Sequence, residues 1–198
     1  EVRIMLEDRV EMPRLYMVWH SPAMFEQGDA EMDLVGDLLG SGKTSRLYRT
    51  LVYDQRLALD ASAYQNSREL SSFFLIAVTA APGRSLADIA AVVDTALARL
   101  AEDGPTEAEM ARAEAQVEAH FMYRLQSVGG FGGKSDQLNA YNVFSGTPAY
   151  FAEDLARYRR ATPEGVRDAA RRVLQVDRRV LLSVVPRGQS ALALTGSE

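Results

Sequence analysis

The sequence contains no cysteine and only two histidines among its 198 residues. The absence of cysteine excludes disulfides, thiolate catalysis and cysteine-ligated zinc. A catalytic zinc site needs three protein ligands, and the sequence has no H-x-x-E-H motif. His20 and His120 would share a metal only if folding brought them together. We therefore expect both to be hydrogen-bonded structural residues. The sequence has no nucleophile-elbow pattern, so serine catalysis is not expected either.

Long apolar runs and an excess of positive charge are missing as well. No run approaches the ~18 apolar residues that a membrane-spanning helix needs, so no membrane span is expected. The net charge of −5 argues against binding to nucleic acid, for which a basic surface would be expected. With 47% hydrophobic and 25% charged residues, the composition is that of an ordinary globular protein.

The N-terminus lacks two further features, a start methionine and the layout of a signal peptide. It opens directly on strand-like residues, EVRIML. We therefore expect this chain to be a piece of a longer polypeptide, in which any targeting segment lies upstream. A periplasmic or secreted location would follow if that upstream segment is a signal peptide.

What the sequence does contain is a grouped order of strand and helix patterns. Alternating or β-forming residues predict strands at 1–8, 15–20, 58–66, 72–80 and 179–185. Apolar residues at helical spacing predict helices at 29–39, from 44 or 45, at 86–100, 106–125, 135–144 and 147–160, and from 162. Because 72–80 is apolar on both faces, we expect a central strand there. Grouped rather than alternating elements predict an α+β fold. Without a repeat or long linker, we expect a single domain over residues 1–198.

Local signals mark several element ends. Thr106 and Glu109 have the spacing of a capping box, and Pro163 suits the first turn of a helix. Gly40 stands where a glycine at a helix C-terminus is expected. The tail after Pro186 is small and polar-flanked, so we expect it to fray.

The glycine-rich stretch 39–51 (LGSGKTSRLYRTL) separates two helical patterns. Its Gly-Lys-Thr is the end of a P-loop signature, in which backbone amides surround a phosphate. That signature would require glycine at the position of Asp37, and a P-loop follows a strand rather than a helix. These departures disfavour nucleotide binding. They favour a turn between two packed helices, with Lys43 and Arg46 at its surface.

A series of segments gives the chain a family resemblance. It starts at 38–48 (LLGSGKTSRLY) and continues through 51–55, 79–83, 104–109, 162–166 and 184–186. In this order the segments resemble the second, metal-free half of a subunit in the pitrilysin/insulinase family of zinc metallopeptidases. The resemblance implies an antiparallel or mixed sheet with helices layered on one face. It also implies two halves that close around a chamber for peptides.

The resemblance implies where the chemistry of such a protein lies. The family's zinc motif, H-x-x-E-H with a distant glutamate, belongs to the first half. This implies zinc in the parent protein and no metal bound by this chain. A family arginine and tyrosine that hold the substrate or the oxyanion fall on Val52 and Leu59, which donate no hydrogen bond. We therefore predict no catalytic residue here and no peptide cleavage by this chain alone.

The resemblance leaves the chain a role in shaping the chamber. The glycine-rich turn corresponds to a substrate-contacting loop of related processing peptidases. This implies chamber-lining roles for Gly40, Ser41, Gly42, Lys43, Arg46 and Tyr48, although core packing is the competing interpretation for Tyr48. The edge of the hairpin strand could also pair with an extended peptide by strand addition.

Two functions follow, from different classes. The first is the non-catalytic C-terminal domain of a zinc endopeptidase, which forms chamber wall and subunit interface. Its partners would be the zinc-bearing N-terminal half, a homologous sister subunit and peptide substrates. The second is a proteolytically inactive structural or assembly subunit of the same fold. An intact H-x-x-E-H motif upstream would support the first function, and a degenerate one the second.

Overall fold

Alternating exposed and buried residues build one five-stranded sheet in the computed structural model, which describes residues 1–198. The strands are β1 (Val2–Asp8), β2 (Arg14–Ser21), β3 (Ala58–Asn66), β4 (Ser72–Ala80) and β5 (Arg179–Pro186). Their spatial order is β1-β5-β2-β4-β3, and only the β1–β5 pair is parallel. Each predicted strand is confirmed. As predicted, β4 is an interior strand, and its alternate residues are fully buried.

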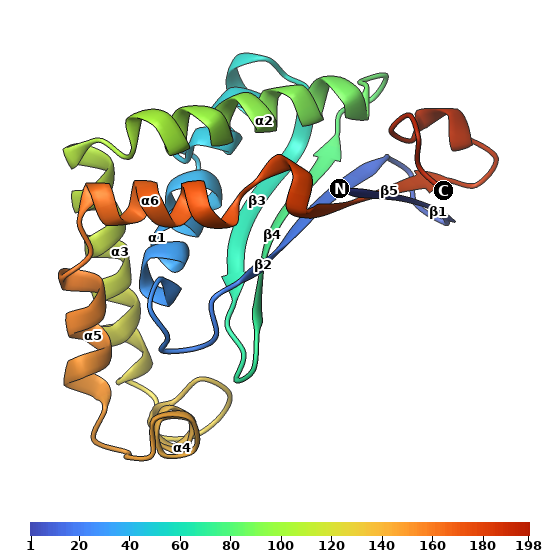
Figure 1. Ribbon diagram of the computed structural model, residues 1–198. Coiled ribbons are helices and arrows are strands. Elements are labelled where there is room, and N and C mark those ends of the chain that lie inside the picture. The colour runs from blue at the N-terminus through green and yellow to red at the C-terminus, as the bar shows by residue number, and fades with distance from the viewer.

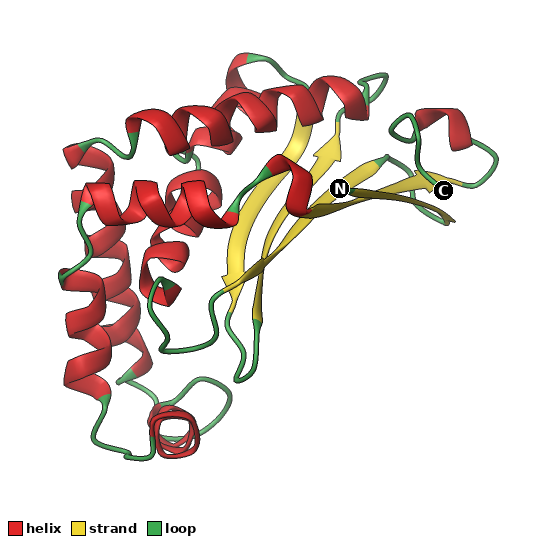
Figure 2. Ribbon diagram, in the orientation of Figure 1, coloured by secondary structure: helices red, strands yellow, loops and turns green.

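The long helices lie on one side of this sheet (Figure 1, Figure 2). They are α1 (Asp29–Gly40), α2 (Leu86–Asp103), α3 (Glu107–Arg124), α4 (Lys134–Ser145), α5 (Phe151–Arg159) and α6 (Pro163–Val173). A π-helical segment, η1 (Tyr48–Asp54), and two 3-10 turns, η2 (Val176–Arg178) and η3 (Ser190–Leu192), complete the chain. One core of 35 buried residues joins sheet and helices. The α+β fold, a mixed sheet with helices on one face, is confirmed. No helix combines the length and apolar character needed to span a membrane.

Two of the predicted helix starts, at Thr106 and Pro163, are present in the structure. The hydroxyl of Thr106 accepts a hydrogen bond from the Glu109 amide (3.2 Å), and the Glu109 carboxylate accepts one from the Thr106 amide (2.9 Å). This reciprocal pair is the predicted capping box. Pro163 occupies the first turn of α6, after the N-cap residue Thr162. Short-range sequence signals therefore place both helix ends correctly.

The start of α5 differs from the prediction, because this helix begins at Phe151 rather than at 147. Gly146 adopts a left-handed backbone (φ 76°), which ends α4. The residue before Pro148 is sterically disfavoured from helical geometry. The segment between the two helices is consequently a turn.

The C-terminal tail is ordered rather than frayed, contrary to the prediction. The Met5 amide donates to the Glu198 carbonyl (2.9 Å), and the Glu198 amide donates to the Arg3 carbonyl (3.2 Å). Leu194 is buried, and its amide donates to the Ser183 hydroxyl (3.2 Å). The tail is fixed because it satisfies backbone groups of the edge strand β1 and adds an apolar side chain to the core.

Gly40 has a packing role rather than the predicted capping role. It is the last residue of α1, but the C-cap is Ser41, which has an extended backbone. A Cβ atom on Gly40 would lie 1.9 Å from the nitrogen of Ala63 and 2.7 Å from its Cβ. The glycine therefore lets the end of α1 contact the backbone of β3 directly.

No long helix covers the second face of the sheet, which we call the open face (Figure 2). Exposed apolar side chains of β1, among them Val2, Ile4 and Leu6, lie on it. Strand register places one apolar row across all five strands, formed by Val2, Val180, Val18, Leu75 and Tyr64. At the edge, Val2 is 56% exposed, and Tyr64 at the other edge is 45% exposed. Contiguous apolar surface of this kind is typical of an interaction site.

Candidate functional site

The glycine-rich turn joins the end of α1 to η1, so it follows a helix, as the sequence predicted. Gly42 is exposed and has a left-handed backbone (φ 74°), and Lys43 is also exposed. Ser41 and Tyr48 are half-buried. The helical context of Gly42-Lys43-Thr44 is not that of a P-loop. A chamber-lining role for this turn remains a prediction.

Arg46 is tied to a neighbouring helix rather than free at the surface of the turn. Its guanidinium donates to both carboxylate oxygens of Glu109 (2.8 Å each) and to the carbonyl of Gly104 (2.9 Å). The hydrogen bond from Arg46 holds the pKa of Glu109 at about 2, so this carboxyl is ionised at neutral pH. Arg46 therefore links the turn to the start of α3, a structural role that the sequence pattern did not indicate.

Val52 and Leu59, on which the resemblance places a family arginine and tyrosine, lie in η1 and β3. Val52 packs against the core, and Leu59 is 54% exposed. His20 is exposed at the end of β2, and His120 is exposed on α3. No group of three His, Cys, Asp or Glu side chains is placed to hold a metal ion. The side chains of Val52 and Leu59 carry no hydrogen-bond donor.

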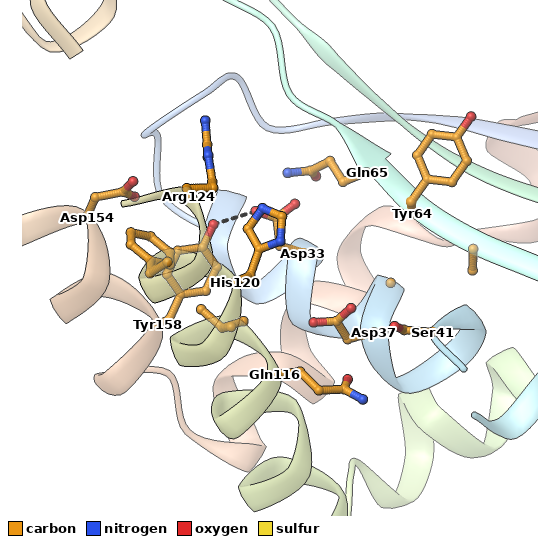
Figure 3. Close-up of a pocket in the computed structure, with 14 residues that line it drawn as sticks. Asp33, Asp37, Ser41, Tyr64, Gln65, Gln116, His120, Arg124, Asp154 and Tyr158 are labelled. Atoms are coloured by element: carbon orange, nitrogen blue, oxygen red, sulfur yellow. Dashed lines mark hydrogen bonds between the residues drawn. The ribbon is translucent and has the colours of Figure 1, made fainter. Parts of the chain in front are cut away.

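A cavity of about 530 Å³ lies between α1, α3, α5 and the edge strand β3 (Figure 3). Its polar lining includes Asp33 and Asp37 of α1, Gln65 of β3, His120 and Arg124 of α3, and Tyr158 of α5. The volume is within the range of small-ligand sites. Of the six residues that the sequence analysis assigned to the chamber lining, Ser41 alone borders this cavity.

Two carboxyl groups on α1 face the cavity without a cationic partner. Asp33 and Asp37 are one helical turn apart, so they project from the same side of the helix. Asp33 accepts a hydrogen bond from the Tyr158 hydroxyl (2.6 Å; Figure 3). Burial, reinforced by the charge of Asp29, raises the pKa of Asp33 to about 7, and burial also raises the pKa of Asp37. Neither carboxyl forms an ion pair.

The other carboxyls near the cavity are paired with one arginine. Arg157 donates to Asp29 (3.0 Å) and to Asp154 (2.6 Å), and all three side chains are largely buried. Gln65 donates to the same Asp29 carboxylate (2.7 Å). Arg157 also lies over the ring of Phe25, 4.8 Å from its centroid. This network joins α1, α5 and the β3–β4 hairpin.

A comparison with protein families identifies the family to which the chain belongs. The family model of the Peptidase M16 inactive domain matches residues 1–117, which is more than half of the chain. The chain belongs to the M16 peptidase family, as an inactive domain. The resemblance found in the sequence is thereby confirmed. A search of curated proteins finds no significant match.

Solved structures share the fold of this M16 domain. A protease from Helicobacter pylori has a TM-score of 0.81 at 19% identity, over 93% of this chain and 44% of its own. The inactive peptidase domain of a candidate zinc protease from Bordetella parapertussis has a TM-score of 0.77 at 20% identity. The match covers 91% of this chain and 96% of that domain. The ferredoxin protease FusC, in complex with Arabidopsis ferredoxin, has a TM-score of 0.68 at 18% identity. The match covers 93% of this chain and 20% of FusC. The chain thus spans under half of the Helicobacter protease.

The cavity of this M16 domain was missed by the sequence analysis. The apolar spacing of residues 29–39 predicts a helix but does not indicate that its acidic residues are buried. One signal was available, because Asp29, Asp33 and Asp37 recur every four residues. Such spacing places them along one side of the helix. Their burial depends on α5 and on β3, which lie far away in sequence.

Asp33 gives this M16 domain a pH-dependent stability. Its pKa is 3.8 ordinarily and about 7 when folded, so its stabilising contribution is complete below about pH 4 and is lost as pH rises through 7. Asp33→Asn does not ionise and can still accept from Tyr158. We expect the wild-type melting temperature to fall more than that of Asp33→Asn between pH 5 and 8. The control is Asp103→Asn, at an exposed site on α2. If the melting temperatures of the wild type and of Asp33→Asn change equally with pH, the pKa of Asp33 is not raised in the folded state.

Proposed function

We propose that this chain is the non-catalytic C-terminal domain of a zinc metalloendopeptidase. Membership among the M16 inactive domains supports the proposal, as does the absence of hydrogen-bond donors at Val52 and Leu59. In this proposal the N-terminal half carries the H-x-x-E-H motif, the zinc and the general base. The present chain binds no metal and supplies chamber wall and subunit interface for peptide substrates.

The observation that carries the proposal is the open face of the sheet. Its apolar row from Val2 to Tyr64 crosses every strand, and no helix of this chain covers it. Burying apolar surface contributes roughly 25 cal/mol per Å². We therefore propose that the zinc-bearing half packs against this face. The chain matches only 44% of the Helicobacter protease, so the rest of that protein is long enough to contain a second half.

The proposal is tested by supplying the zinc-bearing half of the complete gene product and this chain as separate polypeptides. Leu6 lies on β1 and is 50% exposed, with its side chain on the open face. Leu6→Asp is expected to weaken association at least ~10-fold, because a carboxylate would be buried without a partner. The same substitution at Leu70, 91% exposed in the β3–β4 turn, is the matched control and should leave association unchanged. Analytical ultracentrifugation measures both.

Catalysis gives the second readout of this test. The assembled halves should cleave a quenched fluorescent peptide, whereas this chain alone should neither cleave it nor retain zinc. Equal association of the two variants would overturn the proposal. So would cleavage, or one tightly held zinc ion, in the isolated chain. If the two halves assemble normally but cleave no peptide, the protein is instead the proteolytically inactive structural subunit.

A further inference from the structure

The glycine-rich loop between α3 and α4 holds one aromatic side chain out in solvent. Phe131 is 109% exposed and lies between Gly130 (φ 83°) and Gly132 (φ 79°). A left-handed backbone favours glycine, so these two positions set the turn on which the ring stands. The Lys134 amide closes the loop by donating to the Ser127 carbonyl (2.9 Å). The loop therefore presents Phe131 in a fixed position.

Other exposed apolar side chains surround this ring, and with it they form what we call the Phe131 patch. They are Tyr123 on α3, Val128 in the loop, and Leu138 and Val143 on α4, and all four are 49–74% exposed. Tyr123 and Phe131 line the same hollow, and Phe131 lines a second hollow with Ser135 and Asn139. Val143 follows Asn139, and Leu138 follows Ser135, by one helical turn. The Ser135 amide also donates to the Val128 carbonyl (3.0 Å). The patch is therefore continuous.

The patch has the size of a protein–protein interface. The Tyr123 and Phe131 rings of two copies would together bury up to roughly 1,000 Å². The aliphatic side chains beside them add to this area. A standard interface buries about 1,600 Å² in total. Apolar surface of this extent on one side of a molecule marks an interaction site rather than ordinary solvent-exposed surface.

The shape of the patch favours a second copy of the chain as its occupant. A hollow of about 350 Å³ lies beside the protruding ring and is lined by Tyr123, Ser127 and three glycines. A cavity of about 150 Å³ already holds a benzene ring, so a phenyl ring fits here. In a twofold dimer one surface meets itself, so protrusion and hollow must lie side by side. Phe131 itself borders the hollow, which meets this requirement.

The charges at the patch are also self-complementary. Lys134 and Asp136 are both exposed in the first turn of α4, and neither forms an ion pair within the chain. A twofold axis between them would bring each residue to the opposite charge of the other copy. The net charge of −5 disfavours an anionic membrane surface as the occupant.

We propose that the Phe131 patch joins two copies of this chain in a twofold dimer, with Phe131 of each copy in the hollow beside Tyr123 of the other. Because the loop is already fixed, little conformational freedom is lost on association. Figure 1 shows α4 and the loop before it at the opposite end of the molecule from α2. The patch shares no element with the open face, so this dimer does not depend on the proposed function.

Sedimentation velocity of the 198-residue chain tests the dimer. The dissociation constant is expected to be about 1–100 µM, and association should stop at the dimer because a twofold contact closes. Phe131→Ser should weaken the dimer at least ~10-fold, as the loss of a central aromatic side chain does. The matched control is Tyr53→Ser, which removes a ring that is 77% exposed on η1 and should leave the dimer unchanged.

A second variant separates a specific hollow from a merely adhesive surface. Ser127→Trp fills the hollow and leaves Phe131 in place, so it should also weaken the dimer at least ~10-fold. An adhesive surface would instead associate more tightly when an apolar ring is added. Repeating the measurements in the Leu6→Asp chain excludes association through the open face. Circular dichroism melting checks that each exposed substitution leaves the fold intact.

Three outcomes would overturn the inference. They are a wild-type chain that remains monomeric up to about 200 µM, equal self-association of Phe131→Ser and Tyr53→Ser, and tighter association of Ser127→Trp. If Phe131→Ser weakens assembly with the zinc-bearing half but not self-association, the patch belongs to that half and the dimer is likewise wrong. An intact dimer whose chains do not assemble with the zinc-bearing half would instead remove the proposed function and leave this inference standing.

Discussion

Replacing Gly40 with alanine is expected to lower the free energy of unfolding by at least ~3 kcal/mol. The new Cβ would lie 1.9 Å from the Ala63 nitrogen, a distance that no packed carbon tolerates. Because the clash is with the backbone of β3, a rotamer change cannot relieve it, and α1 must move. For a chain of this size the melting temperature should fall by roughly 6–12 °C, measured by circular dichroism.

The control for this substitution is Gly129→Ala. Gly129 has no atom within 4 Å of the position that a Cβ would take, and its backbone is not left-handed. Its replacement should change the unfolding free energy by less than about 1 kcal/mol. If Gly40→Ala and Gly129→Ala have the same melting temperature, α1 does not lie in direct contact with the β3 backbone.

Replacing Arg157 with alanine is expected to destabilise the fold by about 3–5 kcal/mol. The arginine is 12% exposed, and its partners Asp29 and Asp154 are 2% and 10% exposed. Its removal leaves two buried carboxylates without a cation, and the loss is mainly the penalty of those unpaired charges. Urea unfolding measures the change. Adding Asp29→Asn to the variant should restore part of the stability, because it removes one of the unpaired charges.

Arg159 provides the comparison within the same helix. It pairs with Glu118, but the two side chains are 60% and 47% exposed. Arg159→Ala should therefore cost less than about 1 kcal/mol, as exposed ion pairs do. Equal losses in the two variants would show that the buried network contributes no more than a surface pair.

The strands and the starts of α3 and α6 could be predicted because their signals are local. The run 72–80 is apolar on both faces and is an interior strand. The capping box at Thr106 and Glu109 needs only a spacing of three residues. Such patterns report the environment of a segment without knowledge of its neighbours. The family resemblance extended this local information to the layering of helices on one face.

The contacts that build the site could not be predicted in the same way. Arg46 reads as a surface residue of a turn, but its partner Glu109 lies 63 positions away. Asp33 likewise becomes buried through Tyr158, which is 125 positions away. Neither pairing has a local signal, because it depends on how separate elements pack. The tail was misjudged for the same reason, since its partner is the first strand of the chain.

The pairing of β1 with β5 and the tail also has a consequence for synthesis on the ribosome. Val2 lies opposite Val180, so the first strand has no neighbour in the sheet until the last one has emerged. At typical translation rates of 5–20 residues per second the delay is roughly 10–40 s. During that interval an apolar strand with free backbone edges is available to chaperones or to another nascent chain.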